Sequence, residues 1–181
     1  MLTKNSLRSK ILSILKKQTA QQRLKKSRLI KQKLFELEVF KKAKSVMFYL
    51  AYAGEVETKE MIREAIEEGK TVAVPVCITK ERKLVPCKIG PHTRFIKGPY
   101  GIKEPLKKIP LPIESLDLVI VPAVAFDKKG NRLGRGKGYY DSFLSTIPKK
   151  TFSIGIAFDF QIVPRLPVRP CDVPVKQVLF A

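Results

Sequence analysis

The chain has 181 residues and a formal net charge of +20, because 36 Lys and Arg outnumber 16 Asp and Glu. This length suits one domain with a real core, spanning residues 1–181. The apolar stretches are strand-sized, which excludes a membrane span. Three cysteines without a CxxC spacing argue against a disulfide framework and a zinc site. We therefore expect a monomer of the reducing cytoplasm with no membrane partner.

Residues 1–40 predict a helical amino-terminal part. The first acidic residue is Glu36, and such a basic, acid-free start also fits a mitochondrial transit peptide. The apolar spacing favours two packed helices instead, and Thr19 with Gln22 forms a capping box that opens the second. The predicted packed faces are Leu7, Ile11, Ile14 and Leu15, then Leu24, Ile30, Leu34 and Leu37.

Residues 41–181 alternate between strand-like and helix-like segments, which predicts an α/β core with a mostly parallel sheet. A helix is expected to begin near Thr58, which is a plausible cap, and another near Tyr139. Residues 90–115 are dense in Gly and Pro and predict a long loop, in which the lone His92 is solvated. Strands are predicted over residues 45–52, 71–76, 116–125, 151–157 and 175–180.

The run from Asn131 to Asp141 holds three cations, three alternating glycines, two phenols and a carboxylate. It follows a predicted buried strand and precedes a predicted helix, so a phosphate could approach unpaired backbone N–H groups there. A P-loop needs Ser or Thr where Gly138 follows Lys137, and the dinucleotide fingerprint needs another glycine, so neither motif fits. The alternative without a binding function is a glycine-rich turn with solvated charges.

Four other segments of the chain, in a fixed order and spacing relative to this run, contribute to a family resemblance. They are Lys4-x-x-x-Arg8, residues 54–58 (Gly-Glu-Val-Glu-Thr), residues 100–105 (Tyr-Gly-Ile-Lys-Glu-Pro), and Phe-Asp at 126–127 ahead of 131–141. Together they resemble the 5-formyltetrahydrofolate cyclo-ligase family, also called 5,10-methenyltetrahydrofolate synthetase. The resemblance implies a three-layer, Rossmann-like open sheet, mostly parallel, with the two amino-terminal helices packed on it. It also implies ATP-dependent cyclisation of 5-formyltetrahydrofolate to 5,10-methenyltetrahydrofolate through a phosphorylated formyl intermediate, with release of ADP and phosphate.

The resemblance further implies roles for individual residues. Arg135 and Lys137 would offset charge on a loose phosphoryl transition state, and Glu57 would contact the folate near its reacting atoms. These three are the candidate catalytic residues. The ATP-binding set is Lys4, Arg8, Arg132, Leu133, Gly134, Arg135, Gly136, Lys137, Gly138, Tyr139 and Tyr140. The substrate-binding set is Tyr52, Glu57, Arg135, Gly136, Lys137, Gly138 and Tyr139.

Magnesium is the second expected cofactor besides ATP. Asp141 is the best candidate ligand, since magnesium takes one or two carboxylates plus phosphate oxygens, and Asp172 is the second candidate. The carboxyl-terminal segment departs from the family, which usually has a His-Asp pair and another acid four residues later. This chain has Cys171-Asp172 and then Lys176. If that acid assists magnesium, one ligand is lost here, and Asp172 or water would substitute.

The large positive charge allows two interpretations. It could steer small polyanions into a cleft, such as ATP and the polyglutamate tail of cellular folates. It could equally neutralise a nucleic-acid backbone, but no helix-turn-helix, zinc finger or aromatic RNA-binding signature accompanies it, so we expect no nucleic-acid partner. The alternatives to a cyclo-ligase are another ATP-dependent phosphoryl transferase and a basic nucleic-acid-binding protein.

Overall fold

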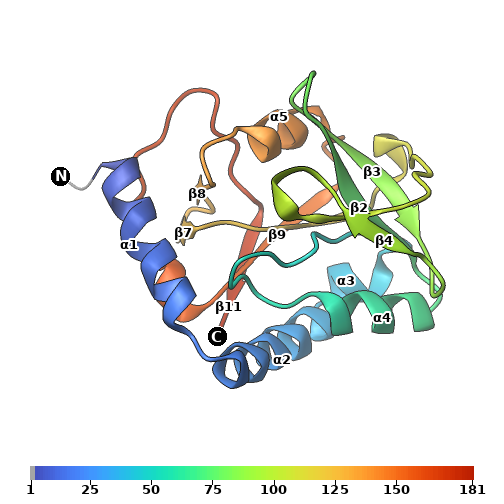
Figure 1. Cartoon of the computed structure of the whole chain (residues 1–181), viewed down its shortest axis with the longest axis horizontal. Coiled ribbons are helices and arrows are strands. Elements are labelled where there is room, and N and C mark those ends of the chain that lie inside the picture. The colour runs from blue at the N-terminus through green and yellow to red at the C-terminus, as the bar shows by residue number, and fades with distance from the viewer. Residues whose placement is uncertain (1–2) are drawn as a thin grey trace.

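A computed structural model describes residues 3–181, which build a six-stranded sheet of order β11-β9-β6-β1-β2-β3 (Figure 1). Neighbouring strands run parallel except β2 and β3, which pair antiparallel. The strands are β1 (Ser45–Met47), β2 (Thr71–Ile78), β3 (Lys83–Ile89), β6 (Leu118–Val121), β9 (Phe152–Ala157) and β11 (Gln177–Phe180). The predicted α/β class with a mostly parallel sheet is confirmed.

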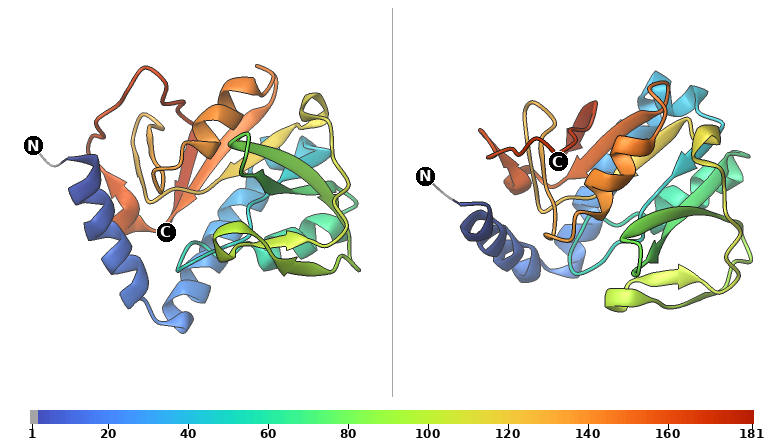
Figure 2. Two further views of the ribbon diagram at one scale, coloured as in Figure 1. Left: turned by 45° about the horizontal axis from the view of Figure 1, so that its top comes forward. Right: turned by 90° about the horizontal axis from the view of Figure 1, so that it is seen from above.

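Helices cover both faces of this sheet and give three layers (Figures 1 and 2). The core on one face takes in α1 (Lys4–Lys17), α2 (Ala20–Glu36), α3 (Glu38–Lys42) and α4 (Lys59–Glu67), and the other core takes in α5 (Tyr139–Thr146). Strand residues alternate between them: Val46 and Leu118 join the first core, Met47 and Val119 the second. No helix within residues 3–181 has the length and apolarity to cross a membrane.

The two amino-terminal helices form as predicted. Thr19 and Gln22 exchange side-chain to backbone hydrogen bonds, so the capping box is confirmed. Leu7, Ile11 and Leu15 of α1 and Ile30 and Leu34 of α2 are buried. The prediction for Leu24 is wrong: it is 42% exposed, because the buried stripe of α2 runs through Ser27, Ile30 and Leu34 and leaves Leu24 at its edge.

Two strands are shorter than their apolar runs predict. The run at 45–52 forms a ladder only in β1; Phe48 donates once more to Ala73, and the chain then leaves the sheet. Phe48 and Tyr49 stay buried, whereas Tyr52 at the end of the run is exposed. The run at 116–125 splits into β6 and β7 (Ala125–Asp127), because Pro122 between them has no N–H to donate. Strand β7 pairs with β10 (Ile162–Val163) and β8 (Arg132–Leu133) in a small separate sheet.

Residues 90–115 are not the structureless loop that their prolines predict. They contain an antiparallel hairpin of β4 (Phe95–Lys97) and β5 (Lys103–Pro105), joined by the turn η1 (Pro99–Gly101) and followed by η2 (Ile113–Ser115). A two-stranded hairpin tolerates Pro105 because one edge of each strand needs no ladder partner. The tip of this hairpin, yellow-green in Figure 1, projects toward the middle of the molecule.

The strand order reverses beside β1. The chain places β2 and β3 on one side of β1, and β6, β9 and β11 on the other. In open parallel sheets, ligands bind beyond the carboxyl ends of the strands at such a switch point. The segments that leave β1 and β6 there contain Tyr52, Glu57 and the whole glycine-rich loop, so the topology brings these predicted site residues to one edge.

Asp127 fixes the turn that delivers the glycine-rich loop. Its buried carboxylate accepts hydrogen bonds from the backbone N–H groups of Lys129, Asn131 and Leu166 and from the Asn131 side chain, all between 2.9 and 3.1 Å. Burial alone would raise the pKa of Asp127, but these hydrogen bonds outweigh it and lower the pKa below its usual value.

We predict that Asp127→Asn lowers the free energy of unfolding near neutral pH by about 3 kcal/mol, because an amide cannot accept all four bonds. With a lowered folded pKa, the stabilisation is complete above the unfolded pKa of about 3.9 and is lost as pH falls through the folded value. Urea unfolding should therefore show a difference in the free energy of unfolding between wild type and Asp127→Asn that vanishes in acid. A difference that is constant with pH would contradict this account, and Glu81→Gln, at an exposed acid, is the control.

Candidate functional site

The glycine-rich loop connects β8 to α5. Gly136 and Gly138 have φ angles of +95° and +74°, in the left-handed region that favours glycine. Gly138 is the N-cap of α5 and offers no side-chain hydrogen bond, so the first N–H groups of the helix stay available to an anion. A Cβ at Gly134 would lie 2.7 Å from the Arg132 guanidinium. The loop therefore needs glycine for its turns and for its close packing on Arg132.

Helix α1 places two cations beside this loop. Arg8 donates from Nε to the Gly134 carbonyl at 3.0 Å, and its guanidinium lies next to Gly136. Lys4, one turn earlier, pairs with Asp172 at 2.5 Å. The side chains predicted to share one helix face thus both point into the region of the loop.

Arg132 lies beneath the loop with only 4% of its side chain exposed. Its Nη2 pairs with Asp141 Oδ1 at 2.8 Å, and its guanidinium lies 5.5 Å from the Tyr140 ring centroid. Within residues 3–181, Arg132 Nε and the Tyr140 hydroxyl are buried without a hydrogen-bond partner. Burial also raises the pKa of Tyr140. Buried polar groups are normally paired, so these two indicate a site completed by ligand or water.

Arg135 joins the loop to the segment that follows β1. Its Nε and Nη2 donate to Glu55 Oε1 at 3.1 and 2.9 Å, and Nη2 also donates to the Tyr52 carbonyl at 3.2 Å. The guanidinium lies 5.2 Å from the Tyr52 ring centroid. Burial raises the pKa of Glu55, while Arg135 beside it acts in the opposite direction. Glu55 has no role in the sequence prediction, and its place after a strand end is the signal that could have found it.

Glu57 faces α2 rather than the loop. Its carboxylate pairs with Arg23 at 2.9 Å, and its backbone N–H donates to Ser27 Oγ at 3.0 Å. Thr58 precedes α4 as predicted, but its hydroxyl donates to the Tyr49 carbonyl and makes no capping bond. The structure thus brings Tyr52 to the glycine-rich loop, with Glu55 in place of Glu57 as the carboxylate beside Arg135.

The tip of the β4–β5 hairpin covers the site beside Tyr139. The Tyr100 and Tyr139 hydroxyls share a hydrogen bond at 3.2 Å, with ring centroids 6.2 Å apart. This hydrogen bond raises the pKa of Tyr139 to about 12. Lys137 Nζ lies 5.7 Å from the Tyr100 ring centroid and forms no ion pair within residues 3–181. Tyr100 therefore belongs to the candidate site, and Lys137 has its charge available for a ligand.

Asp141 and Asp172 belong to neighbouring segments. Asp141 Oδ1 accepts a hydrogen bond at 3.4 Å from the backbone N–H of Val173, the residue after Asp172. Arg132 and Lys4 hold the two carboxylates. No group of three His, Cys, Asp or Glu side chains suited to a metal occurs within residues 3–181. Two carboxylates near the glycine-rich loop still fit magnesium, which can take its other ligands from water and phosphate oxygens.

Lys176 lies at the amino ends of the parallel strands. Its Nζ donates to the carbonyls of Lys149 and Thr151 at 2.7 and 2.9 Å, just before β9 begins. Its side chain is therefore at the amino ends of the strands, away from Asp141 and Asp172 beyond the carboxyl ends.

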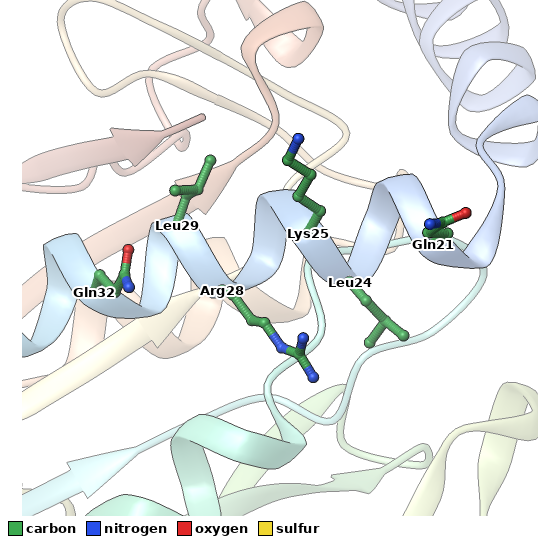
Figure 3. A pocket seen from close by; sticks show the side chains of 6 residues that line it. All are labelled: Gln21, Leu24, Lys25, Arg28, Leu29 and Gln32. Atoms are coloured by element: carbon green, nitrogen blue, oxygen red, sulfur yellow. The ribbon is translucent and has the colours of Figure 1, made fainter.

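An open hollow of about 400 Å³ lies along α2, away from the loop. It is lined by Gln21, Leu24, Lys25, Arg28, Leu29 and Gln32. All come from one helix, and Figure 3 shows Lys25 and Leu29 pointing to one side while Leu24 and Arg28 point to the other. This is the outer surface of a helix, so the converging groups around the glycine-rich loop remain the candidate site.

The fold and this loop define an α/β protein with a candidate anion site at the switch point of its sheet. The pattern of the 5-formyltetrahydrofolate cyclo-ligase family matches residues 1–181, and the chain belongs to this family of ligases. It is 34% identical to 5-formyltetrahydrofolate cyclo-ligase of Haemophilus influenzae over 97% of its own length and 96% of the relative. The corresponding mouse protein is 30% identical, over 98% and 93%.

A solved structure agrees with the architecture. The NMR structure of Aquifex aeolicus 5,10-methenyltetrahydrofolate synthetase superposes with a TM-score of 0.86 and 33% identity, covering 99% of this chain and 90% of that one. Both the family resemblance and the three-layer fold expected from the sequence are confirmed.

We predict that Glu55→Ala lowers the free energy of unfolding by about 2–3 kcal/mol, because it leaves Arg135 and the Tyr52 N–H without their acceptor. The side chain of Glu55 is 11% exposed and that of Glu57 33%. The matched variant Glu57→Ala should therefore cost about 1 kcal/mol or less. Urea unfolding measures both losses, and equal losses would show that the Glu55 pair does not fasten the loop.

Proposed function

We propose that this chain is an ATP-dependent 5-formyltetrahydrofolate cyclo-ligase. One observation carries the proposal: a cationic glycine-rich loop at a helix N-terminus meets three tyrosines at the switch point of the sheet. The loop suits a polyphosphate, and the tyrosines suit a flat ring. Membership in the family supports ATP and 5-formyltetrahydrofolate as the two ligands.

The phosphates of ATP would lie against residues 133–138 and the first turn of α5. The free N–H groups and the helix dipole favour negative charge there. Lys4 and Arg8 would reach the phosphates from α1, and Arg132 from below the loop, with charge-assisted hydrogen bonds. The orphaned hydroxyl of Tyr140 would gain a partner in the filled site.

The folate would lie on the side of Tyr52, Tyr100 and Tyr139. Arg135 lies over one of these rings and Lys137 over another, so both cations stand where the two ligands would meet. Of the two acids that follow β1, Glu55 has its carboxylate at this place, and Glu57 is the second candidate for contact with the folate.

In the proposed reaction, the formyl oxygen attacks the terminal phosphorus of ATP, and ADP leaves with the electron pair of the broken P–O bond. The nitrogen at position 10 then attacks the formyl carbon of the resulting imidate phosphate and closes the ring. The C–O bond to phosphate breaks, and inorganic phosphate leaves with that electron pair and with the proton of the attacking nitrogen. No protein side chain forms a covalent bond. Arg135 and Lys137 would align the ligands and offset charge on the transferring phosphoryl group.

Asp141 and Asp172 are the residues that would hold magnesium. The ion would neutralise charge on the phosphate oxygens. Phosphate oxygens can replace these carboxylates as partners of Lys4 and Arg132, which would leave both acids available to the metal. The net charge of +20 supports polyanionic ligands generally, and binding of a polyglutamylated folate should weaken with salt.

We predict that the purified protein forms methenyl product, seen by its near-ultraviolet absorbance, only when 5-formyltetrahydrofolate, ATP and magnesium are all present. Lys137→Ala should lower kcat/KM by about 100-fold or more, because it removes a charge aimed at the transition state. Lys128→Ala, at an exposed lysine of the β7–β8 turn, is the matched control and should stay within about twofold. A phosphorylated product, or full activity in Lys137→Ala, would contradict the proposal.

We also predict that Asp141→Asn and Asp172→Asn each raise the magnesium concentration needed for half-maximal rate by about tenfold or more, since each loses one carboxylate ligand. A magnesium titration at saturating ATP measures this shift. Asp159→Asn removes an exposed acid that pairs with Lys26 and should leave the titration unchanged. Unchanged titrations in both site variants would place the metal elsewhere.

A further inference from the structure

Glu104 in β5 is a buried carboxylate without a part in the proposed reaction. Its residue is 2% exposed. Oε1 accepts a hydrogen bond from the Cys77 backbone N–H at 2.8 Å, and Oε2 pairs with Lys108 at 3.2 Å. Burying a carboxylate is costly unless its oxygens have partners. Both oxygens of Glu104 have one, which indicates that the carboxylate has a specific role at this position.

The partner of Glu104 lies next to the site. Cys77 is near the carboxyl end of β2, at the edge of the sheet where the ligands are proposed to bind. Glu104 therefore fastens the β4–β5 hairpin to that edge. Its side chain also fills the space under the turn: a Cβ at Gly98 would lie 2.7 Å from Glu104 Cγ and Cδ.

The turn above Glu104 carries Tyr100. Gly98 N–H donates to the Ile102 carbonyl at 2.8 Å and closes the turn, in which Tyr100 has a φ of 59°. A tyrosine in the left-handed region is held there only by its surroundings. Tyr100 in turn contacts Tyr139 and Lys137, and the neighbouring Gly101 packs on Tyr52.

We propose that Glu104 is a positioning residue, which anchors the hairpin on the Cys77 N–H and so sets Tyr100 over the folate side of the site. The inference rests on the proposed function, because it assigns Tyr100 to the folate. Glu104 acts through an accepted backbone hydrogen bond, so a neutral acceptor of the same shape can replace it. The ion pair with Lys108 is exposed on the lysine side and contributes little.

The test compares steady-state kinetics of Glu104→Ala, Glu104→Gln and Lys108→Ala. Glu104→Ala should raise KM for 5-formyltetrahydrofolate about tenfold, the effect of one misplaced aromatic contact, with kcat and the KM for ATP within about threefold. Glu104→Gln and Lys108→Ala should stay within about threefold of wild type. If Glu104→Ala does not fold, Gly98→Ala disturbs the same packing from the turn and should raise the same KM.

A double-mutant cycle separates positioning from a merely structural role. In a Tyr100→Ala background, Glu104→Ala should add no more than about a twofold change, because its effect passes through Tyr100. The proposal would be overturned if the two substitutions raised KM independently, so that their effects multiply. A tenfold rise of KM for 5-formyltetrahydrofolate in Glu104→Gln would overturn it as well.

A spectroscopic readout keeps this inference distinct from the proposed function. Wild type and Glu104→Gln should show a nuclear Overhauser effect between the Tyr100 and Tyr139 rings, which Glu104→Ala or Gly98→Ala should lose. If wild type lacks cyclo-ligase turnover, the proposed function fails, and this comparison still decides whether Glu104 holds Tyr100. If turnover is present but the Overhauser effect between the two rings persists in Glu104→Ala and Gly98→Ala, the inference alone fails.

Discussion

The carboxylates that neutralise the crowded cations of the site are the contacts on which the rest of the structure depends. Lys4, Arg132 and Arg135 each pair with an acid from a different segment: the stretch before β11, helix α5 and the exit of β1. Like charges a few ångströms apart in a partly buried place repel unless counter-ions lie close. The three ion pairs therefore satisfy the cations. At the same time they join α1 to the stretch before β11, β8 to α5, and the glycine-rich loop to the exit of β1.

Features with local signals could be predicted from the sequence. The amino-terminal helices follow from their apolar spacing and from the Thr19–Gln22 capping box, which depends on residues three apart. The loop before α5 follows from glycines alternating with cations. The β4–β5 hairpin could not be predicted, because its strands are only three residues long, lie among prolines, and are held by Glu104, whose partner Cys77 lies in another strand.

Local sequence patterns also could not predict side-chain positions that depend on the path of the chain in three dimensions. Glu55 and Glu57 follow the same strand, but Ala53 and Gly54 have φ angles of 48° and 89°, and this turn leaves Glu55 beside Arg135 while Glu57 reaches Arg23. Lys176 is close to Asp172 in sequence, and its spacing suggests a lost metal ligand. Between them the chain crosses from the carboxyl to the amino edge of the sheet, so Lys176 bonds the carbonyls of Lys149 and Thr151 instead.

We infer that one loop serves both ligands at the switch point of the sheet. A crystal structure with 5-formyltetrahydrofolate and a non-hydrolysable ATP analogue tests it most directly. We expect the phosphates on the backbone of residues 134–138 and the start of α5, with the formyl oxygen facing the terminal phosphate between Arg135 and Lys137. Phosphates bound elsewhere, with Arg132 and Arg135 still paired to Asp141 and Glu55, would contradict it.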